Sequence, residues 1–505
     1  MAEPKKTLAY PADEINELLD KVKNPATEPI ASDALITSGG VRDALDNMRE
    51  ILAEAEKQAT DNRIRISKLS GTLERDYAKK SDIIVQGEDA WYGIEYDVTV
   101  SSPTCTRIGS ATLHAQLPIQ SQMRGCLLND SGEVERYLDS VSWTAETRDG
   151  SKGQVMVEIP SHYRMFETSG NKRRVKLSTF PLAGYTLVPR VYVSAYEASL
   201  NRDTLTLSSV VNASTTYRGG DNISAYDGTY RTLLGKPVTN ISLSALRGYA
   251  RNRNNGRTSE WNTLTYDVLK TIYWLFVVEY ATFNSQLRFN ASATPNGYRQ
   301  GGLGSGVTTL NGAALTSFNG TRPFISCGYT DSLGNGTGVV DFTMPTEYSS
   351  TATTVSVPRY RGIEHPFGHI GKLMDGCLIA TANTPSAQHT DFYVCRNPEK
   401  YADNANDGYG FRCSLPRENG YIVELAFGTE GECVAKSVGG STTTYICDYF
   451  YNAVPSAGTA ELRIAMWGGN AQTNTPAGLA YIVYSEKPTT TAINAGTRLC
   501  FIPNI

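Results

Sequence analysis

The sequence predicts a multidomain protein in which an N-terminal helical coiled-coil stalk precedes a β-rich body. Its 505 residues exceed the length of one ordinary domain. Charged residues concentrate in residues 41–82, where apolar residues recur with a helical period. From Trp91 onward, Gly, Ser, Thr and Asn separate short alternating runs that are typical of strands. We expect four regions, namely an attachment segment with a short helix (1–40), the stalk (41–83), a β-rich neck (84–160) and a distal domain (161–505).

The stalk is predicted from an apolar seam in which steps of four and three residues alternate. The seam consists of Val41, Leu45, Met48, Leu52, Ala55, Ala59, Asn62, Ile66, Leu69 and Leu73. A long amphipathic helix on a globular core is the alternative, but such a helix usually carries a wider apolar stripe. A single helix with this narrow seam is marginal in water, so we expect oligomerisation. Leu at the a positions and Asn62 at a d position favour a parallel homotrimer.

The body is expected to consist mainly of strands and loops. The strand-like runs are GQVMVEIP (153–160), VKLSTF (175–180), TLVPRVYV (186–193) and TLTLSSVV (204–211). Two helices are predicted, one at 242–253 with Ser242 as its N-cap and one at 265–286. Residues 291–356 are rich in Gly, Thr, Asn and Ser, and we expect long surface loops there.

Composition excludes several classes of partner. The net charge of −4 and the pI of about 5.9 leave no global basic field for nucleic acid. The most apolar stretch, Ile272–Val278, is far shorter than the about 20 residues that span a bilayer, so we expect no membrane insertion. The nine cysteines form no CxxC pair, which argues against a zinc ribbon and against a secreted disulfide scaffold. We expect reduced, mostly buried thiols in a protein assembled in a reducing cytoplasm.

Four distal segments together resemble the C-type-lectin-like domains of the formylglycine-generating-enzyme type. They are WNTLTYDVLKTIYWLFVVEYATFNSQ (261–286), YRGIEHPFGHIGKLMDG (360–376), MWGGNAQTNTPAGLAYIVY (466–484) and GTRLCF (496–501). The resemblance implies a C-terminal α+β C-type-lectin-like domain. Gly371 and Leu373 stand where that family often has Trp, and Thr497 replaces its usual Phe, so we expect different packing at these positions.

Earlier segments resemble fibre proteins of Bacteroides-infecting tailed phages, including crAss-like phages. These segments are YPADEINELLDKV (10–22), PIASDALITSGGVRDAL (29–45), TCTRIGS (104–110) and LPIQSQMRGCLLND (117–130). The resemblance implies a head or tail fibre on the virion surface, assembled in the host cytoplasm. Its N-terminus would attach to a capsid or tail protein, and its distal domain would bind a bacterial surface glycan or protein.

An enzyme would need reactive cysteines or a hydrolase motif. The oxidases of the resembling family hold copper between reactive cysteines, but Cys395, Cys413, Cys433 and Cys447 lie in segments unlike that catalytic strand. No GxSxG elbow supports a hydrolase triad. We therefore expect no enzyme and no cofactor. A capsule-degrading glycosidase remains an alternative, because paired carboxylates are brought together by the fold.

A metal site and a phosphate site are not expected either. His365 and His369 are four residues apart, but Pro366 and Gly368 between them break the helix that would place both on one face. We interpret these histidines as structural. The GGLGSG run at 301–306 lacks the Lys-Ser/Thr of a phosphate-binding loop.

Binding is the remaining function, and tyrosine and asparagine concentrate where it would occur. Both residue types suit recognition loops, because they combine rigid contact area with adaptable hydrogen bonding. The resemblance places the expected receptor-binding residues in terminal loops, and these are Tyr449, Tyr451, Asn452, Trp467, Asn470, Gln472 and Asn474. The alternatives are that these are ordinary surface residues and that the protein is a structural decoration fibre without a specific receptor.

Overall fold

The computed structural model describes residues 88–217, 219, 234–253, 259–289, 325–343, 354–470, 473, 475–492 and 494–503. The chain divides after Ile84 into two units, and every described residue belongs to the second unit, Val85–Ile505. The predicted coiled-coil seam from Val41 to Leu73 and the attachment segment 1–40 therefore lie outside the described residues. Most of the tract 291–356 also lies outside them.

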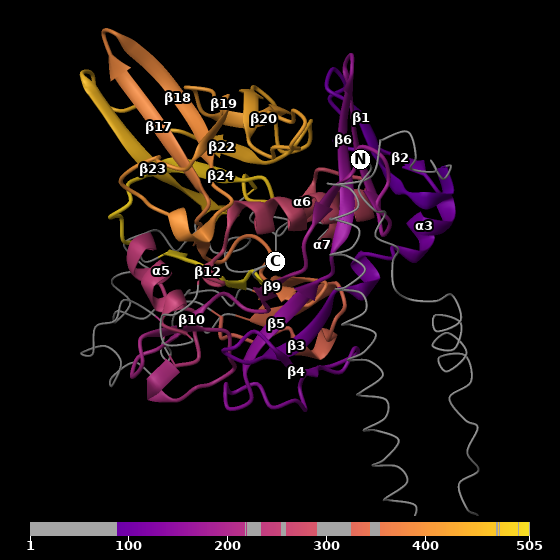
Figure 1. The fold of residues 1–505 in the computed structure, drawn as a ribbon, viewed down its shortest axis with the longest axis vertical. Coiled ribbons are helices and arrows are strands. Elements are labelled where there is room, and N and C mark those ends of the chain that lie inside the picture. The colour runs from indigo at the N-terminus through magenta and orange to yellow at the C-terminus, as the bar shows by residue number, and fades with distance from the viewer. Residues whose placement is uncertain are drawn as a thin grey trace, which may run out of the picture. The chain divides into compact units, whose positions relative to one another are not determined.

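The described part is mostly β and contains several antiparallel sheets (Figure 1), which confirms the predicted β-rich body. Each predicted strand run contains at least one strand. These are β5 (Gln154–Ile159), β7 (Lys172–Ser178), β8 (Thr186–Val188), β9 (Val191–Ser194) and β11 (Thr206–Ser208).

Both predicted helices are also present. α5 (Leu243–Arg251) begins after Ser242, whose hydroxyl accepts the Ala245 N–H at 3.4 Å as an N-cap should. The second predicted helix is divided into α6 (Tyr266–Tyr280) and α7 (Ser285–Phe289). The division follows from Ala281, whose left-handed backbone (φ 51°) ends α6. No helix in the described ranges is long and apolar enough to cross a membrane.

Two sheets form the lower and right-hand parts of the ribbon in Figure 1. The five-stranded sheet has the order β2 (Thr106–Gly109), β1 (Tyr92–Asp97), β7, β6 (His162–Ser169) and β8. The six-stranded sheet has the order β12 (Trp261–Thr263), β26 (Leu499–Phe501), β9, β5, β3 (Arg124–Leu128) and β4 (Val134–Tyr137).

The six-stranded sheet crosses the expected boundary between a neck at 84–160 and a distal domain at 161–505. β5 precedes that boundary and β9 follows it, yet the two strands pair from Met156↔Ser194 to Ile159↔Val191. The last strand of the chain, β26, lies between β9 and β12 in the same sheet. Strand pairing therefore joins segments from both sides of the expected boundary at residue 160.

Eight strands form a nearly closed barrel, coloured orange and yellow in Figure 1. Their order is β19 (Gly410–Ser414), β18 (Ala387–Val394), β17 (Cys377–Thr384), β23 (Thr459–Trp467), β24 (Ile482–Glu486), β22 (Tyr449–Tyr451), β20 (Gly420–Leu425) and β21 (Ala435–Val438). The first and last strands approach each other, since Ser414 of β19 and Lys436 of β21 line one pocket. β16 (Gly371–Leu373) pairs with β23 and with β25 (Ala495–Gly496) beside the barrel.

The remaining elements are short. They are α3 (Ala111–Gln116), β10 (Ser199–Asn201), which pairs with β11, the sheet of β13 (Gly338–Thr343), β14 (Thr354–Tyr360) and β15 (Ile363–Glu364), and the 3₁₀ turns η2 (Glu88–Ala90), η3 (Gln120–Gln122), η4 (Thr215–Tyr217), η8 (Asp331–Leu333) and η9 (Pro398–Lys400).

Helix α6 lies at the centre of the main core. Its apolar run Ile272–Val278 is buried throughout. The Trp274 ring contacts Phe427, in the loop after β20, at 5.5 Å between centroids. On another side the same ring contacts Phe166 of β6 at 5.7 Å. The helix therefore joins the barrel to the five-stranded sheet through aromatic packing.

Gly371, Leu373 and Thr497, where we expected packing different from that of the resembling family, each have close neighbours. A Cβ atom added at Gly371 would lie 2.5 Å from Sδ of Met466, so a larger side chain does not fit there. Thr497 is buried, and its hydroxyl donates to the Leu373 carbonyl at 2.7 Å. The small residue at 371 lets β16 lie close to Met466 of β23, and the Thr497 hydroxyl joins β16 to the segment that follows β25.

Candidate functional site

The outer face of the barrel carries tyrosines on two adjacent strands. In β22, Phe450 points inward and contacts the buried Tyr484 ring at 5.5 Å, so its neighbours Tyr449 and Tyr451 point outward. Tyr451 is 41% exposed. The antiparallel register of β20 and β22 sets Tyr421 opposite Tyr449, and their rings meet edge to face at 5.1 Å.

A fourth tyrosine, Tyr481, joins this group from the residue before β24. β22 and β24 are parallel with Phe450 opposite Ile482, so Tyr481 lies on the outward face with Tyr449. Burial and the neighbouring phenols of Tyr451 and Tyr449 raise the pKa of Tyr481 to about 12, although its hydrogen bond with Thr473 acts in the opposite direction. We call Tyr421, Tyr449, Tyr451 and Tyr481 the tyrosine surface.

A buried carboxyl group supports the loop beneath this surface. Asp448 precedes β22 and is buried, and it accepts the Ala480 N–H at 2.7 Å. A Cβ atom at Gly478 would lie 2.0 Å from Oδ1 of Asp448, so glycine is required for this close approach. Burial raises the pKa of Asp448 well above its usual range, which favours the neutral carboxyl group.

Helix α7 also holds the loop before β24, through hydrogen bonds to residues 475–479. Gln286 donates from Nε2 to the Thr475 carbonyl at 2.8 Å and also to the Ala477 carbonyl. The Ser285 hydroxyl accepts the Leu479 N–H at 3.1 Å. The loop before β24 is thus held by side chains from two separate elements, which positions Tyr481 beside Tyr449 and Tyr451.

The expected receptor-binding residues divide into surface and interior positions. Tyr449 and Tyr451 belong to the tyrosine surface. Asn470 is 7% exposed, and its backbone N–H donates to the Thr473 hydroxyl at 3.1 Å. Gln472 and Asn474 lie outside the described residues.

Asn452 and Trp467 are interior residues, which corrects their interpretation as exposed contacts. Asn452 is 2% exposed and donates from Nδ2 to the Pro416 carbonyl at 2.9 Å. Trp467 is fully buried, and its indole N–H donates to the Leu479 carbonyl at 2.5 Å. The physical reason is that Trp467 ends β23 at an inward position, where its ring fills the core of the barrel.

Sequence reasoning missed Tyr421 and Tyr481. Tyr421 begins the alternating run YIVEL (421–425), a local signal for a strand with tyrosine and valine on one face. That signal does not reveal that the strand pairs with β22. Tyr481 precedes the run IVY, and its partners likewise depend on pairing between distant strands.

The cysteines and the two histidines His365 and His369 occupy structural settings. All nine cysteines are free, and burial raises the pKa of Cys413 and of Cys433 to about 12, which disfavours thiolates. His365 and His369 stack at 4.0 Å between ring centroids. His369 faces Glu197 through Nδ1 and accepts the Ile325 N–H through Nε2, so both of its nitrogens have protein partners. Within the described ranges, no group of three or more His, Cys, Asp or Glu residues is arranged to hold a metal ion.

Comparison of the chain with protein-family models and with curated proteins found no match.

Proposed function

We propose that the chain is a virion fibre of a tailed phage, attached to the head or tail by its N-terminal segment, and that it binds the host cell surface through its C-terminal region. The tyrosine surface is the observation that supports this most directly. Four phenol rings gather on the outside of the barrel, over a loop that is fixed from two sides. Such rings offer rigid contact area together with hydroxyl groups, the chemistry of recognition surfaces.

The finer fold belongs to the same proposal, and it is a C-type-lectin-like arrangement of the distal region. The four segments that resemble this family lie next to one another in space. Trp261 of the first segment pairs with Phe501 of the last. Lys372 of the second pairs with Trp467 of the third and with Gly496 of the last. This mutual pairing supports the idea that the four segments form one structural unit.

Trimerisation through residues 41–83 would multiply the effect of each site. A surface of one exposed and three half-buried tyrosine rings gives weak binding by itself. Three copies that engage one host surface bind more tightly, because the later contacts form within the complex. A fibre on the virion surface has this geometry available, and its partner would be a bacterial surface glycan or protein.

The test is adsorption of the purified full-length protein to host cells. Tyr451→Ala and Tyr449→Ala are expected to reduce adsorption at least tenfold, because truncated aromatic anchors typically lose about 2 kcal/mol or more per site. Phe180→Ala is the matched control, since Phe180 is 59% exposed and lies between β7 and β8, outside the strands that carry the tyrosine surface. This control is expected to adsorb like the wild type.

Folding and function are separated by measuring mass and melting temperature of each variant. A loss of adsorption with unchanged mass and melting temperature supports the proposal. Wild-type adsorption by both tyrosine variants would remove the tyrosine surface from the mechanism and favour the decoration fibre. Release of saccharides from host capsule by the wild type would favour the glycosidase.

A further inference from the structure

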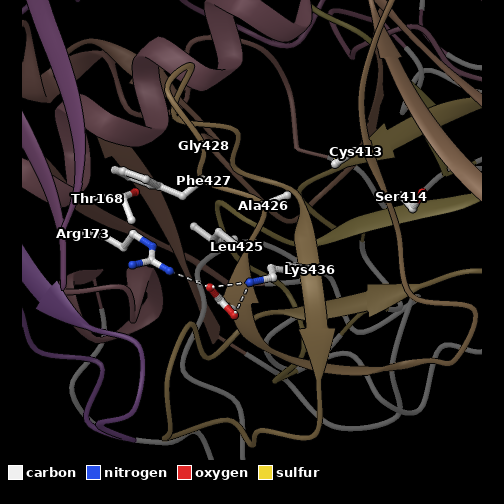
Figure 2. A pocket seen from close by; sticks show the side chains of 10 residues that line it. Thr168, Arg173, Cys413, Ser414, Leu425, Ala426, Phe427, Gly428 and Lys436 are labelled. Atoms are coloured by element: carbon white, nitrogen blue, oxygen red, sulfur yellow. Dashed lines mark hydrogen bonds and ion pairs between the residues drawn. The ribbon is translucent and has the colours of Figure 1, made fainter. Parts of the chain in front are cut away.

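A pocket of about 420 Å³ lies where the nearly closed barrel meets the five-stranded sheet (Figure 2). Its volume falls in the range of small-molecule sites. Residues of β6 and β7 line one side, and residues of β19, β20, β21 and the loop after β20 line the other. The lining residues are Thr168, Arg173, Cys413, Ser414, Glu424, Leu425, Ala426, Phe427, Gly428 and Lys436.

Two cations and one carboxylate give the pocket a net positive charge. Arg173 donates from Nη2 to Oε1 of Glu424 at 3.0 Å, and Lys436 donates from Nζ to the same oxygen at 3.0 Å (Figure 2). The side chain of Arg173 is 12% exposed, whereas that of Lys436 is 57% exposed. One cation is therefore held at the wall of the pocket and the other reaches its opening.

Arg173 has donors to spare in this arrangement. A guanidinium carries five N–H donors. Nη1 donates to the carbonyls of Gly170 and Lys172, and Nη2 donates once to Glu424. Among the described residues, the Nε–H and the second Nη2–H of Arg173 have no protein acceptor. Such a pair of donors suits a carboxylate, which accepts two parallel hydrogen bonds from arginine.

The rest of the lining combines hydroxyl groups with an apolar floor. Thr168 and Ser414 are exposed, and the Ser414 hydroxyl donates to Asp391 at 2.7 Å, so its oxygen can still accept a hydrogen bond. Leu425 and Phe427 are almost completely buried and form the floor. A sugar ring that bears a carboxylate matches this lining, since it has apolar C–H groups, hydroxyl groups and one negative charge.

We propose that this pocket binds a uronic acid unit of an acidic polysaccharide, with the sugar carboxylate on Arg173 and Lys436. The inference deepens the proposed function, and it rests on that function for the host cell as the source of the polysaccharide. The pocket shares no residue with the tyrosine surface, although Glu424 and Leu425 of the pocket belong to the same strand, β20, as Tyr421. The two features would give each subunit both a charged contact and an aromatic contact.

The test is calorimetric titration of the full-length protein with trigalacturonic acid. The expected result is binding that weakens as salt rises, because the contact joins opposite charges. Maltotriose, a neutral trisaccharide, and acetate, a carboxylate without a sugar, are expected to bind at least tenfold more weakly. Arg173→Met and Lys436→Met are each expected to weaken trigalacturonate binding about tenfold, the equivalent of one charge-assisted hydrogen bond.

Matched variants keep the result interpretable. Lys152→Met removes one positive charge at an exposed position outside the lining and is expected to bind like the wild type. If Arg173→Met fails to fold, Lys436→Met alone tests the proposal. The Lys436 side chain is largely exposed, so its replacement is expected to leave the melting temperature unchanged. Equal binding of trigalacturonate and maltotriose, undetectable trigalacturonate binding, or wild-type binding by Lys436→Met would each overturn the proposal.

The host adsorption assay distinguishes this inference from the proposed function. Wild-type adsorption by variants that no longer bind trigalacturonate would overturn the pocket's role at the host surface and leave the fibre function standing. Trigalacturonate binding by a protein that does not adsorb to host cells would overturn the fibre function and support the pocket.

Discussion

Asp448 illustrates how one buried side chain can control the candidate site. Its carboxyl group accepts the Ala480 N–H and lies against Gly478, in the loop that leads to Tyr481. Burial disfavours the charged form and raises its pKa well above the usual range. The folded protein therefore holds a proton on Asp448 at pH values where the unfolded chain has released it.

This difference predicts a pH dependence of stability. The contribution of Asp448 is expected to be fully present below the ordinary Asp pKa of about 3.9 and to fall as the pH rises, by about 1.4 kcal/mol for each unit of pKa difference. Asp448→Asn keeps an oxygen for the Ala480 N–H but cannot ionise. The melting temperature of this variant relative to wild type is therefore expected to increase from about pH 4 to about pH 8.

Asp139→Asn provides a control of opposite sign. The N–H groups of Ser142 and Val141 lower the pKa of the exposed Asp139, so its carboxylate stabilises the fold above the ordinary pKa. The melting temperature of Asp139→Asn relative to wild type is therefore expected to decrease as the pH rises. Parallel curves for Asp448→Asn and wild type would contradict the assignment of a raised pKa to Asp448.

At the scale of elements, helix α6 is tied to the barrel by a buried polar cluster. Lys270 and Tyr266 of α6 both reach Oε2 of Glu432, at 3.3 and 2.5 Å, in the loop between β20 and β21. Trp274 adds a hydrogen bond from its indole N–H to the Gly431 carbonyl at 2.7 Å. The loop that these groups hold also includes Phe427 and Gly428, which line the pocket.

Breaking this ion pair is expected to be costly. Lys270 is 0% exposed, and Lys270→Met would remove the ammonium partner of the buried Glu432 carboxylate and leave it only the longer ion pair with Arg412, at 3.6 Å. We expect the free energy of unfolding, measured in urea, to fall by about 3–5 kcal/mol. Lys270→Met combined with Glu432→Gln is expected to recover part of this loss, because the remaining side chain is neutral. A double variant less stable than the single one would refute the explanation that the loss comes from a buried carboxylate deprived of its ammonium partner.

At the scale of the whole molecule, the proposed function depends on oligomerisation through residues 41–83. The seam of alternating four- and three-residue steps is a local pattern, and it predicts helix association without reference to the body. Three bodies on one stalk would present three tyrosine surfaces and three pockets to the same host surface. Weak individual contacts would then add up to firm attachment.

The corresponding prediction is a mass near three times 55.0 kDa by sedimentation equilibrium of the full-length protein. Asn62→Leu is expected to raise the melting temperature of the stalk and to loosen its strand number, because a polar seam residue exchanges stability for specificity. Glu54→Ala, outside the seam, is expected to change neither property. A monomer at micromolar concentration would refute the stalk.

The sequence by itself determined the features that depend on neighbours along the chain. The helical period and the N-cap at Ser242 located α5, and alternation located β5, β7 and β9. These signals are local, because a helix hydrogen-bonds within a few residues and a strand displays its two faces in turn. The sequence also placed Tyr449 and Tyr451 close together along the chain, but it assigned them to a loop, whereas the structure places them on one face of strand β22.

Tertiary structure alone decided which face of each strand meets the core and which strands become neighbours. Alternation in β23 is compatible with Trp467 outside or inside, and pairing with β24 and β16 placed it inside. Pairing of β20 with β22 brought Tyr421 to Tyr449, and approach of β7 to β20 brought Arg173 to Glu424. The physical reason is that strand pairing and core packing are satisfied between segments that are tens to hundreds of residues apart, so no local period encodes them.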